Sequence, residues 1–290
     1  MAVLRRVSKS SDMTHTNFAD ELGAALDAVR AAGAEILRLG GAYEKVTDAP
    51  ADIVTDADLA AQAIIFRILA ERFPNDAVLG EEAYKEDPSI ARAPRLWIVD
   101  PIDGTRGFAI GNGEYSVMVG LVAGGRPVVG VVHEPHVGRT TFAAAGQGCF
   151  VRTSAVGQPM PCSVRPTESM VDATVAMSRS RKTDSEKRLL DRFGARESLK
   201  TYSAGIKLAQ VARGEADLYL GDYPAMHDWD VCAGHILVEE AGGRVTDLAG
   251  EPLVYGREPP RQSRGILATN GLLHAAALAV AKTHGADLYS

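Results

Sequence analysis

An apolar strand that runs directly into paired acidic residues is the feature that most constrains this chain. Residues 96–99 (Leu-Trp-Ile-Val) are followed by Asp-Pro-Ile-Asp-Gly-Thr at 100–105. Because proline has no N–H group, Pro101 is predicted to end the hydrogen-bonded ladder of the strand and to leave the carbonyl of Ile102 facing a cavity. The side chains of Asp100 and Asp103 are then expected to point past the strand end toward one centre.

Three more acidic pairs lie at the ends of predicted elements. They are Glu81 and Glu82 after a short strand, Asp56 and Asp58 at the start of a helix, and Asp228 and Asp230 at an ordinary N-cap position of another helix. Taken singly, such residues are typical of turns, solvated faces and caps. If they converge, each like-charged pair at about 4 Å costs on the order of 4 kcal/mol at an effective dielectric of about 20, which bound cations offset. Oxygen ligands without cysteine or histidine favour Mg²⁺ or Mn²⁺.

Several other catalytic patterns are absent from the sequence. It contains no GxxxxGK phosphate loop, no HExxH zinc motif and no GxSxG serine motif. His133 and His136 have the spacing of a metal-binding pair, but Pro135 between them favours a turn. Carboxylates and a carbonyl cannot catalyse redox chemistry alone, but they can hold two metal ions over a phosphate group.

The composition is that of a globular protein that can fold without a disulfide or a structural metal. Of its 290 residues, 46% are hydrophobic and 23% are charged, and the net charge is −6. These values exclude a disordered, collagen-like or coiled-coil chain, and they give no global attraction for nucleic acid or an anionic membrane. No apolar run approaches the roughly 18–20 residues of a membrane span. Residues 1–13 lack the apolar core of a secretory signal and are predicted to form a disordered tail.

The cysteines indicate the compartment. Cys149, Cys162 and Cys232 lie far apart in the sequence, and none belongs to a CxxC pair. This pattern favours reduced, buried thiols in a cytoplasmic protein over a disulfide framework.

Hydrophobic periodicity divides the chain into an α+β half and an α/β half. The first half, residues 14–163, is predicted to be a metal-binding domain with two helices against a meandering sheet: helices at 17–39 and 57–73, and strands at 77–79, 96–99, 116–122, 127–135, 140–144 and 149–152. In the second half, residues 164–290, strands at 174–177, 218–220 and 265–268 alternate with helices at 184–193, 204–213, 230–241 and 271–283. This alternation predicts a smaller α/β domain that completes the active site and has helices on both faces of its sheet.

The acidic motifs resemble a known superfamily. The chain resembles the inositol monophosphatase superfamily of Mg²⁺-dependent phosphatases. The resemblance rests on Asp-Pro-Ile-Asp-Gly-Thr at 100–105, on Gly-Glu-Glu at 80–82 before it, and on Trp229-Asp230 and Ala-Gly-Gly at 241–243 after it. The match extends over roughly residues 18–280. It implies a layered α-β-α-β-α sandwich, two to three Mg²⁺ ions (with Mn²⁺ as a possible replacement), inhibition by lithium, and hydrolysis of a small phosphorylated metabolite. Relatives include monomers and dimers, so a homodimer is possible.

The resemblance also implies roles for individual residues. The first metal ion would be held by Glu81, Asp100 and the carbonyl of Ile102, and the second by Asp100, Asp103 and Asp230. Thr105 and Asp58 would orient and deprotonate the attacking water. The main-chain amides of Gly104 and Thr105 would cradle the phosphate, as oriented N–H groups do in an anion nest. Lys45 aligns with a basic residue near the metals of relatives.

Three segments favour one branch, the 3′(2′),5′-bisphosphate nucleotidases. Stretches of that branch are similar to Arg-Gly-Phe at 106–108, to residues 175–184 and to Ser-Ala-Gly-Ile-Lys at 203–207. They place Ser178, Arg181 and Lys207, together with Asp230, among the candidate substrate contacts, with Arg179 and Lys182 nearby. A second phosphate would need such donors. Arg181 stands where relatives carry a histidine suited to stacking on adenine, although arginine also stacks on aromatic rings.

Other readings stay open at this point. The basic segment 179–182 could be a solvated loop. The substrate could be myo-inositol 1-phosphate or histidinol phosphate. An alternative from another class is a protein that binds nucleotides in a metal-dependent way without hydrolysing them. The intact Asp58 and Thr105 positions argue against this alternative.

Overall fold

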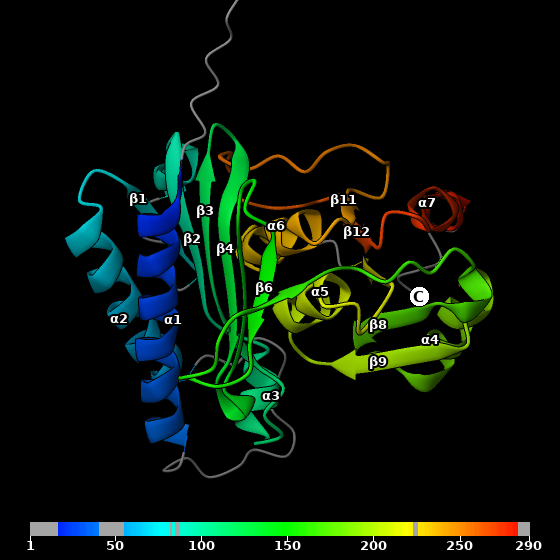
Figure 1. Cartoon of the computed structure of the whole chain (residues 1–290), viewed down its shortest axis with the longest axis horizontal. Coiled ribbons are helices and arrows are strands. Elements are labelled where there is room, and N and C mark those ends of the chain that lie inside the picture. Colours follow the sequence, from blue (N-terminus) through cyan, green and yellow to red (C-terminus); the bar gives the residue numbers. More distant parts are fainter. Residues whose placement is uncertain (1–16, 41–54, 82, 85–87, 223–225, 284–290) are drawn as a thin grey trace, which may run out of the picture.

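The chain folds into two sheets separated and covered by helices (Figure 1). This computed structural model describes residues 17–40, 55–81, 83–84, 88–222 and 226–283. From left to right in Figure 1, the layers are a helix pair, a large sheet, a second helix pair, a small sheet and a third helix pair. The α-β-α-β-α order implied by the resemblance is therefore confirmed.

The large sheet contains seven strands in sequence order. The first pair is parallel and the others are antiparallel: β1 (Ala77–Gly80), β2 (Arg95–Asp103), β3 (Ser116–Ala123), β4 (Arg126–Glu134), β5 (Arg139–Ala144), β6 (Cys149–Arg152) and β7 (Met160–Cys162). Both faces of its central strands are covered, because Trp97 and Val99 pack toward one core and Leu96 and Ile98 toward the other. This explains why the strands are apolar throughout rather than alternating.

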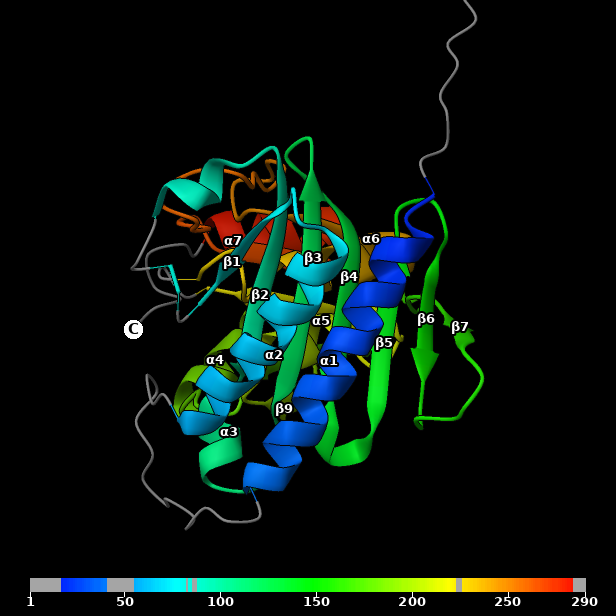
Figure 2. The ribbon, with the colours of Figure 1, turned by 90° about the vertical axis from the view of Figure 1, so that its left-hand side faces the viewer.

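Two helices cover the outer face of the large sheet (Figure 2). They are α1 (Ala19–Gly40) and α2 (Asp56–Arg72), and they pack against each other and against β2, β3 and β4. The buried face of α1 is rich in alanine, with Ala24, Ala25, Ala28 and Ala32 fully covered. Small side chains of this kind let a helix approach a neighbouring backbone closely.

The second helix pair fills the space between the sheets. It consists of α5 (Ala204–Ala212) and α6 (Cys232–Glu240), which pack on each other. Helix α6 lies against β3 and β4, and α5 contacts the strands β8 (Thr174–Ser178) and β10 (Leu218–Gly221) of the small sheet. At Gly130 in β4, a Cβ atom would collide with the carbonyl oxygen of Ala233 and the side chain of Ile236. The contact between α6 and the sheet therefore depends on a glycine.

The small sheet has the order β11-β12-β10-β8-β9. Its strands are β8 (Thr174–Ser178), β9 (Glu197–Thr201), β10 (Leu218–Gly221), β11 (Arg244–Thr246) and β12 (Ile266–Thr269). Helices α4 (Thr183–Phe193) and α7 (His274–Thr283) cover its outer face and share a core with it that includes Leu189, Val175 and Ala277. The prediction of helices on both faces of this sheet is confirmed, with α5 and α6 on the inner face.

One local prediction was wrong. Pro101 does not end its strand: β2 continues to Asp103, and its register against β3 shifts between Asp100 and Asp103. An irregularity of this kind accommodates a residue without an N–H group while the strand continues.

Several short elements were not predicted. They are the edge strands β7, β9 and β11, helix α3 (Thr105–Ala109) and the 3₁₀ turns Pro88–Arg92 and Met170–Asp172. A further 3₁₀ turn spans Pro135–Val137. The turn at Pro135 agrees with the interpretation of the two histidines. His133 shares a hydrogen bond of 2.9 Å with Thr140 and approaches Gly33 of α1, whereas His136 approaches Gly113.

The chain leaves the large sheet at Cys162 and enters the small sheet at Thr174. The division into domains at 163–164 stays a prediction, and the proposed tail at 1–13, Lys45 and Glu82 lie outside the described residues. None of the described helices combines the length and the apolar character that crossing a membrane would require.

We expect Gly130→Ala to lower the free energy of unfolding by about 1–3 kcal/mol, because the added methyl group must push α6 away from β4. The matched control is Gly23→Ala in α1, where a Cβ atom would meet nothing within 4 Å. This control should leave stability unchanged or raise it by up to about 1 kcal/mol, since alanine favours helix. Urea unfolding of both variants measures the effect, and equal stabilities would contradict the close approach.

Candidate active site

A cavity of about 290 Å³ lies where the end of β2 faces the small sheet. One wall comes from the first half of the chain and the other from the second. The lining includes every candidate metal ligand and substrate contact proposed from the sequence: Glu81, Asp100, Ile102, Asp103, Gly104, Thr105, Ser178, Arg181, Lys207 and Asp230. Among the described residues that were given a catalytic, metal-binding or substrate-binding role, Asp58 is the one absent from this lining.

Three carboxylates converge in the cavity. Asp100, Asp103 and Asp230 each offer an oxygen atom within 4.8 Å of the other two. Asp100 and Asp103 come from the irregular end of β2, and Asp230 precedes α6, so the cluster joins residues that are far apart in the sequence. Glu81 follows β1 and lines the same cavity, and its charge acts on Asp100. The described residues therefore offer an all-oxygen ligand set of the kind that hard divalent ions prefer.

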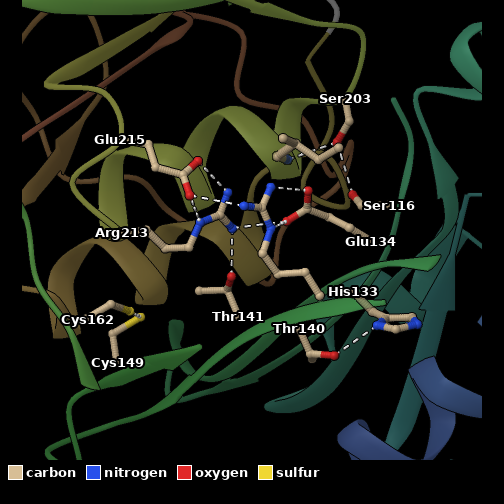
Figure 3. A network of polar contacts seen from close by, with 12 residues as sticks. Ser116, His133, Glu134, Thr140, Thr141, Cys149, Cys162, Ser203, Arg213 and Glu215 are labelled. Atoms are coloured by element: carbon tan, nitrogen blue, oxygen red, sulfur yellow. Dashed lines mark hydrogen bonds and ion pairs between the residues drawn. The ribbon is translucent and has the colours of Figure 1, made fainter. Parts of the chain in front are cut away.

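Asp103 is held by the N-terminus of α5. Its carboxylate accepts hydrogen bonds from the backbone N–H groups of Ala204 at 3.0 Å and Gly205 at 2.6 Å. Ser203, the N-cap residue of α5, donates its hydroxyl to the same carboxylate, and Ser116 Oγ lies 3.0 Å from Ser203 Oγ (Figure 3). The positive end of the helix dipole thus fixes a negative ligand in place.

Asp100 lacks such support. Its Oδ1 atom is buried and accepts no hydrogen bond within the described part of the chain. Burial raises the pKa of Asp100 well above its usual range, and the neighbouring charges of Glu81, Asp103, Asp230 and Asp58 raise it further. The Oδ1 atom is therefore a buried acceptor without a donor, and it is surrounded by carboxylates. Such an environment suits a bound cation, and its oxygen ligands support Mg²⁺ as the ion that the cluster could hold.

Asp230 is the candidate ligand supplied by the second half of the chain. Its carboxylate accepts a hydrogen bond of 2.6 Å from the backbone of His227, and burial followed by the charge of Asp103 raises its pKa to about 7. The predicted N-cap role was wrong for both acids of this segment, because the N-cap of α6 is Val231. Asp228 instead accepts a hydrogen bond of 2.7 Å from Gln262, and only Asp230 reaches the cavity.

Gly104 makes the turn from β2 into α3. Its φ of +86° lies in the left-handed region, and a Cβ atom there would come within 2.9 Å of the Glu114 carbonyl oxygen. Because α3 begins at Thr105, its first N–H groups lack the acceptors that a preceding turn would supply, whereas the N–H of Gly107 donates to the Gly104 carbonyl at 2.7 Å. The Thr105 hydroxyl donates to the Ile102 carbonyl at 2.8 Å, so these two candidate residues lie side by side.

Asp58 does not line the cavity. It is 1% exposed, and it accepts hydrogen bonds from the backbone N–H of Thr55 at 2.8 Å and from the Thr55 hydroxyl at 2.6 Å. It therefore closes a capping box at the start of α2, the structural role that its sequence position also allowed. Its charge raises the pKa of Asp100, so it belongs to the same electrostatic cluster. The pairing of Asp58 with Thr105 in catalysis stays a prediction.

Lys207 is the buried cation of the cavity. It is 3% exposed, it donates to the Tyr202 carbonyl at 3.3 Å, and its Nζ atom lies 5.2 Å from the centre of the Tyr219 ring. Burial lowers its pKa to about 8, while the charges of Asp103 and Asp230 oppose that shift. In the described segments no carboxylate lies within salt-bridge distance of Lys207, so its charge is directed at the cavity rather than at a fixed partner.

Two arginines line the cavity near Lys207. Arg181 is paired with Asp222 at 2.6 Å, and the guanidinium of Arg106 lies 5.7 Å from the centre of the Tyr202 ring. The Nε atom of each is buried and donates to no acceptor among the described residues. Each arginine therefore keeps a donor that an anionic ligand could use.

The basic segment 179–182 divides in the structure. Arg179 is paired with Glu114 and donates to the Lys200 carbonyl at 2.8 Å, and neither Arg179 nor Lys182 lines the cavity. The solvated-loop alternative therefore describes these two residues, but it does not describe Arg181.

Sequence reasoning missed the aromatic and acidic parts of this wall. Tyr202, Tyr219 and Asp222 line the cavity and contact Arg106, Lys207 and Arg181, respectively. No motif marks them, but Tyr202 directly precedes the Ser-Ala-Gly-Ile-Lys stretch, which offered a partial signal.

Comparisons with known proteins agree with this site. The sequence profile described as the inositol monophosphatase family matches residues 14–286. The histidinol-phosphatase of Mycobacterium tuberculosis is 34% identical over 81% of this chain and 87% of its own length. The 3′(2′),5′-bisphosphate nucleotidase CysQ of Salmonella typhimurium is also 34% identical, over 76% of this chain and 83% of its own length. These equal identities leave the substrate unassigned.

A solved structure shows the same fold. The IMPase of Thermotoga maritima superposes with a TM-score of 0.77 and 27% identity, covering 93% of this chain and 99% of that protein. The profile, the relatives and the shared architecture agree with the acidic cavity described above. The chain therefore belongs to the inositol monophosphatase family, and it is a phosphatase that hydrolyses phosphoric monoesters.

Proposed function

We propose that this phosphatase removes the 3′-phosphate of adenosine 3′,5′-bisphosphate in a Mg²⁺-dependent reaction in the cytoplasm. The observation that carries the proposal is one cavity lined by the acidic cluster and also by Arg106, Arg181 and Lys207. A monophosphate would use the acidic cluster alone. A bisphosphate gives Lys207 a second group to bind, and a buried cation without an anion beside it is costly.

Each wall has its own task in this proposal. Mg²⁺ held by Glu81, Asp100, Asp103 and Asp230 would supply positive charge to the phosphate and make a nearby water more acidic. Thr105 and Asp58 are proposed to orient and deprotonate that water, and the N–H groups of Gly104 and Thr105 to bind the phosphate oxygens. Lys207 and Arg181 would position the second phosphate, and Ser178 would line the route to it.

A panel of substrates tests the proposal. Phosphate release in Mg²⁺ is measured side by side from adenosine 3′,5′-bisphosphate, AMP, inositol 1-phosphate and histidinol phosphate, with and without lithium. We expect the highest kcat/KM for the bisphosphate and inhibition of that activity by lithium. A preference for inositol 1-phosphate or histidinol phosphate would overturn the substrate proposal and leave the metal chemistry in place. Nucleotide binding without release from any substrate would overturn the catalytic proposal. Size-exclusion chromatography with light scattering tests whether the protein is a monomer or a homodimer.

Asp100→Asn is expected to reduce kcat by at least about 100-fold, because Asp100 is the ligand proposed to contact both metal ions. The same change should not lower the thermal midpoint of the metal-free protein, because it removes a buried charge from a repelling cluster. Asp172→Asn, on the exposed turn Met170–Asp172, is the matched control and should retain activity. Near-normal turnover of the Asp100 variant would contradict the ligand assignment.

Lys207→Met is expected to raise KM for adenosine 3′,5′-bisphosphate by about 10-fold or more, since a hydrogen bond to a charged group contributes roughly 1.5–3 kcal/mol. The methionine side chain fills the space of the lysine stem, so the values for inositol 1-phosphate and AMP should change little. Lys182→Met is the control, because Lys182 does not line the cavity. An equal rise for all substrates would remove the case for a second phosphate site.

The affinity for Mg²⁺ is expected to fall by at least about 10-fold from about pH 8 to about pH 6. The raised pKa values of Asp100 and Asp230, the latter about 7, favour the protonated carboxyl groups as the pH falls, and Mg²⁺ must displace those protons. Isothermal titration calorimetry in two buffers of different ionisation enthalpy measures both the affinity and the protons released. Binding that is independent of pH, with no proton release, would refute this linkage.

A further inference from the structure

Two cysteines face each other at the edge of the large sheet. Cys149 in β6 and Cys162 in β7 are directly opposite across the antiparallel pair, and their sulfur atoms lie 3.2 Å apart (Figure 3). Opposed residues of antiparallel strands have Cα atoms about 4.5–5.5 Å apart, which lies within the range that a disulfide spans. Both thiols are free in this structure. Only a short movement of the sulfur atoms separates them from a covalent bond.

The two thiols differ in access and acidity. Cys149 is buried, whereas Cys162 is partly exposed on the edge strand. The two thiols share a hydrogen bond, and this interaction raises the pKa of Cys149 and lowers that of Cys162. Arg213 lies close by, and its positive charge favours a thiolate at either position. Cys162 is thus the thiol that an external reagent can reach and the one of the pair that ionises more readily.

Arg213 is fixed beside the pair by a buried network. Its guanidinium lies 3.1 Å from Glu134 and 2.7 Å from Glu215, and it donates to the Thr141 hydroxyl at 2.7 Å (Figure 3). It is also the C-cap residue of α5. The charge next to the sulfur atoms is therefore a built feature of the fold and not a mobile surface group.

We propose that Cys149 and Cys162 form a redox-active pair that low-molecular-weight disulfides convert reversibly into an intramolecular disulfide. The Cys162 thiolate attacks one sulfur of the reagent, and the other sulfur leaves as a thiolate. Cys149 then loses its proton and attacks the Cys162 sulfur, which releases the second thiolate. The protein loses two protons and two electrons in total, and the reagent disulfide is reduced to two thiols.

The disulfide would link the edge strand β7 covalently to β6. β7 is the last strand of the large sheet, and its pairing with β6 is its attachment to that sheet. A disulfide between opposed residues closes the short connection between the two strands and restricts the unfolded chain. Oxidation should therefore stabilise the protein, and reduction should reverse that stabilisation.

The test uses oxidised glutathione on the reduced full-length protein, followed by thiol titration of the denatured chain and intact-mass measurement. The wild type should fall from three free thiols to one, with a mass loss of two hydrogen atoms and no adduct. In Cys149→Ala, Cys162 should retain one glutathione because the second nucleophile is absent. Cys162→Ala should form no adduct, and the control Cys232→Ala should lose both of its thiols.

Three titratable thiols after treatment of the wild type, or a glutathione adduct that persists on it, would overturn the proposal. A disulfide mapped to Cys232 would do the same. As a second readout, oxidation should raise the thermal midpoint of the wild type by roughly 5 °C. Dithiothreitol should reverse this shift, and Cys149→Ala and Cys162→Ala should not show it. An unchanged thermal midpoint despite complete oxidation would overturn the claim that the disulfide stabilises the attachment of β7.

Discussion

Repulsion among buried carboxylates is the constraint on which the rest of this structure depends. Asp100, Asp103 and Asp230 present oxygen atoms within 4.8 Å of one another. A pair of full charges at that distance repels by roughly 3 kcal/mol at an effective dielectric of about 20. The fold maintains this arrangement by binding Asp103 to the N-terminus of α5 and by raising the pKa of Asp100 and Asp230. A bound divalent ion turns the same arrangement into a favourable one.

Helix α5 connects this cluster with the paired thiols. Its first turn binds Asp103, and its C-cap Arg213 is fixed by Glu134 and Glu215 beside the paired thiols. Both ends of the helix are therefore tied to the large sheet by charges, while its sides pack on α6 and the small sheet. A helix held in this way has little freedom to shift, and the position of a metal ligand depends on that rigidity.

Much of this architecture could be predicted from the sequence, because the strongest signals were local. The periodicity of α1, the apolar run of β3 and the acidic ends of the strands needed no knowledge of distant contacts. The polar edge strand β9 was missed because half-buried edge residues carry little hydrophobic pattern. The error at Pro101 arose because a bulge lets a strand continue past a proline.

The supports of the site were harder to predict for the same reason. Nothing near Asp103 in the sequence indicates that its carboxylate caps a helix a hundred residues later. The pairing of Arg181 with Asp222, and the place of Lys207 over the Tyr219 ring, likewise depend on how the small sheet faces the large one. Sequence motifs identify the groups that do chemistry more readily than the groups that hold them.

The two walls of the cavity come from different parts of the fold. The acidic wall comes mainly from β1, β2 and the turn into α3, whereas Ser178, Arg181, Lys207 and Tyr219 come from the small sheet and α5. Substitutions on the second wall can change which phosphate ester fits while the hydrolytic apparatus stays intact. A gene encoding this fold can therefore acquire a new substrate by drift at a few positions after duplication. The equal resemblance of this chain to relatives named for different phosphate esters is what such a history would leave.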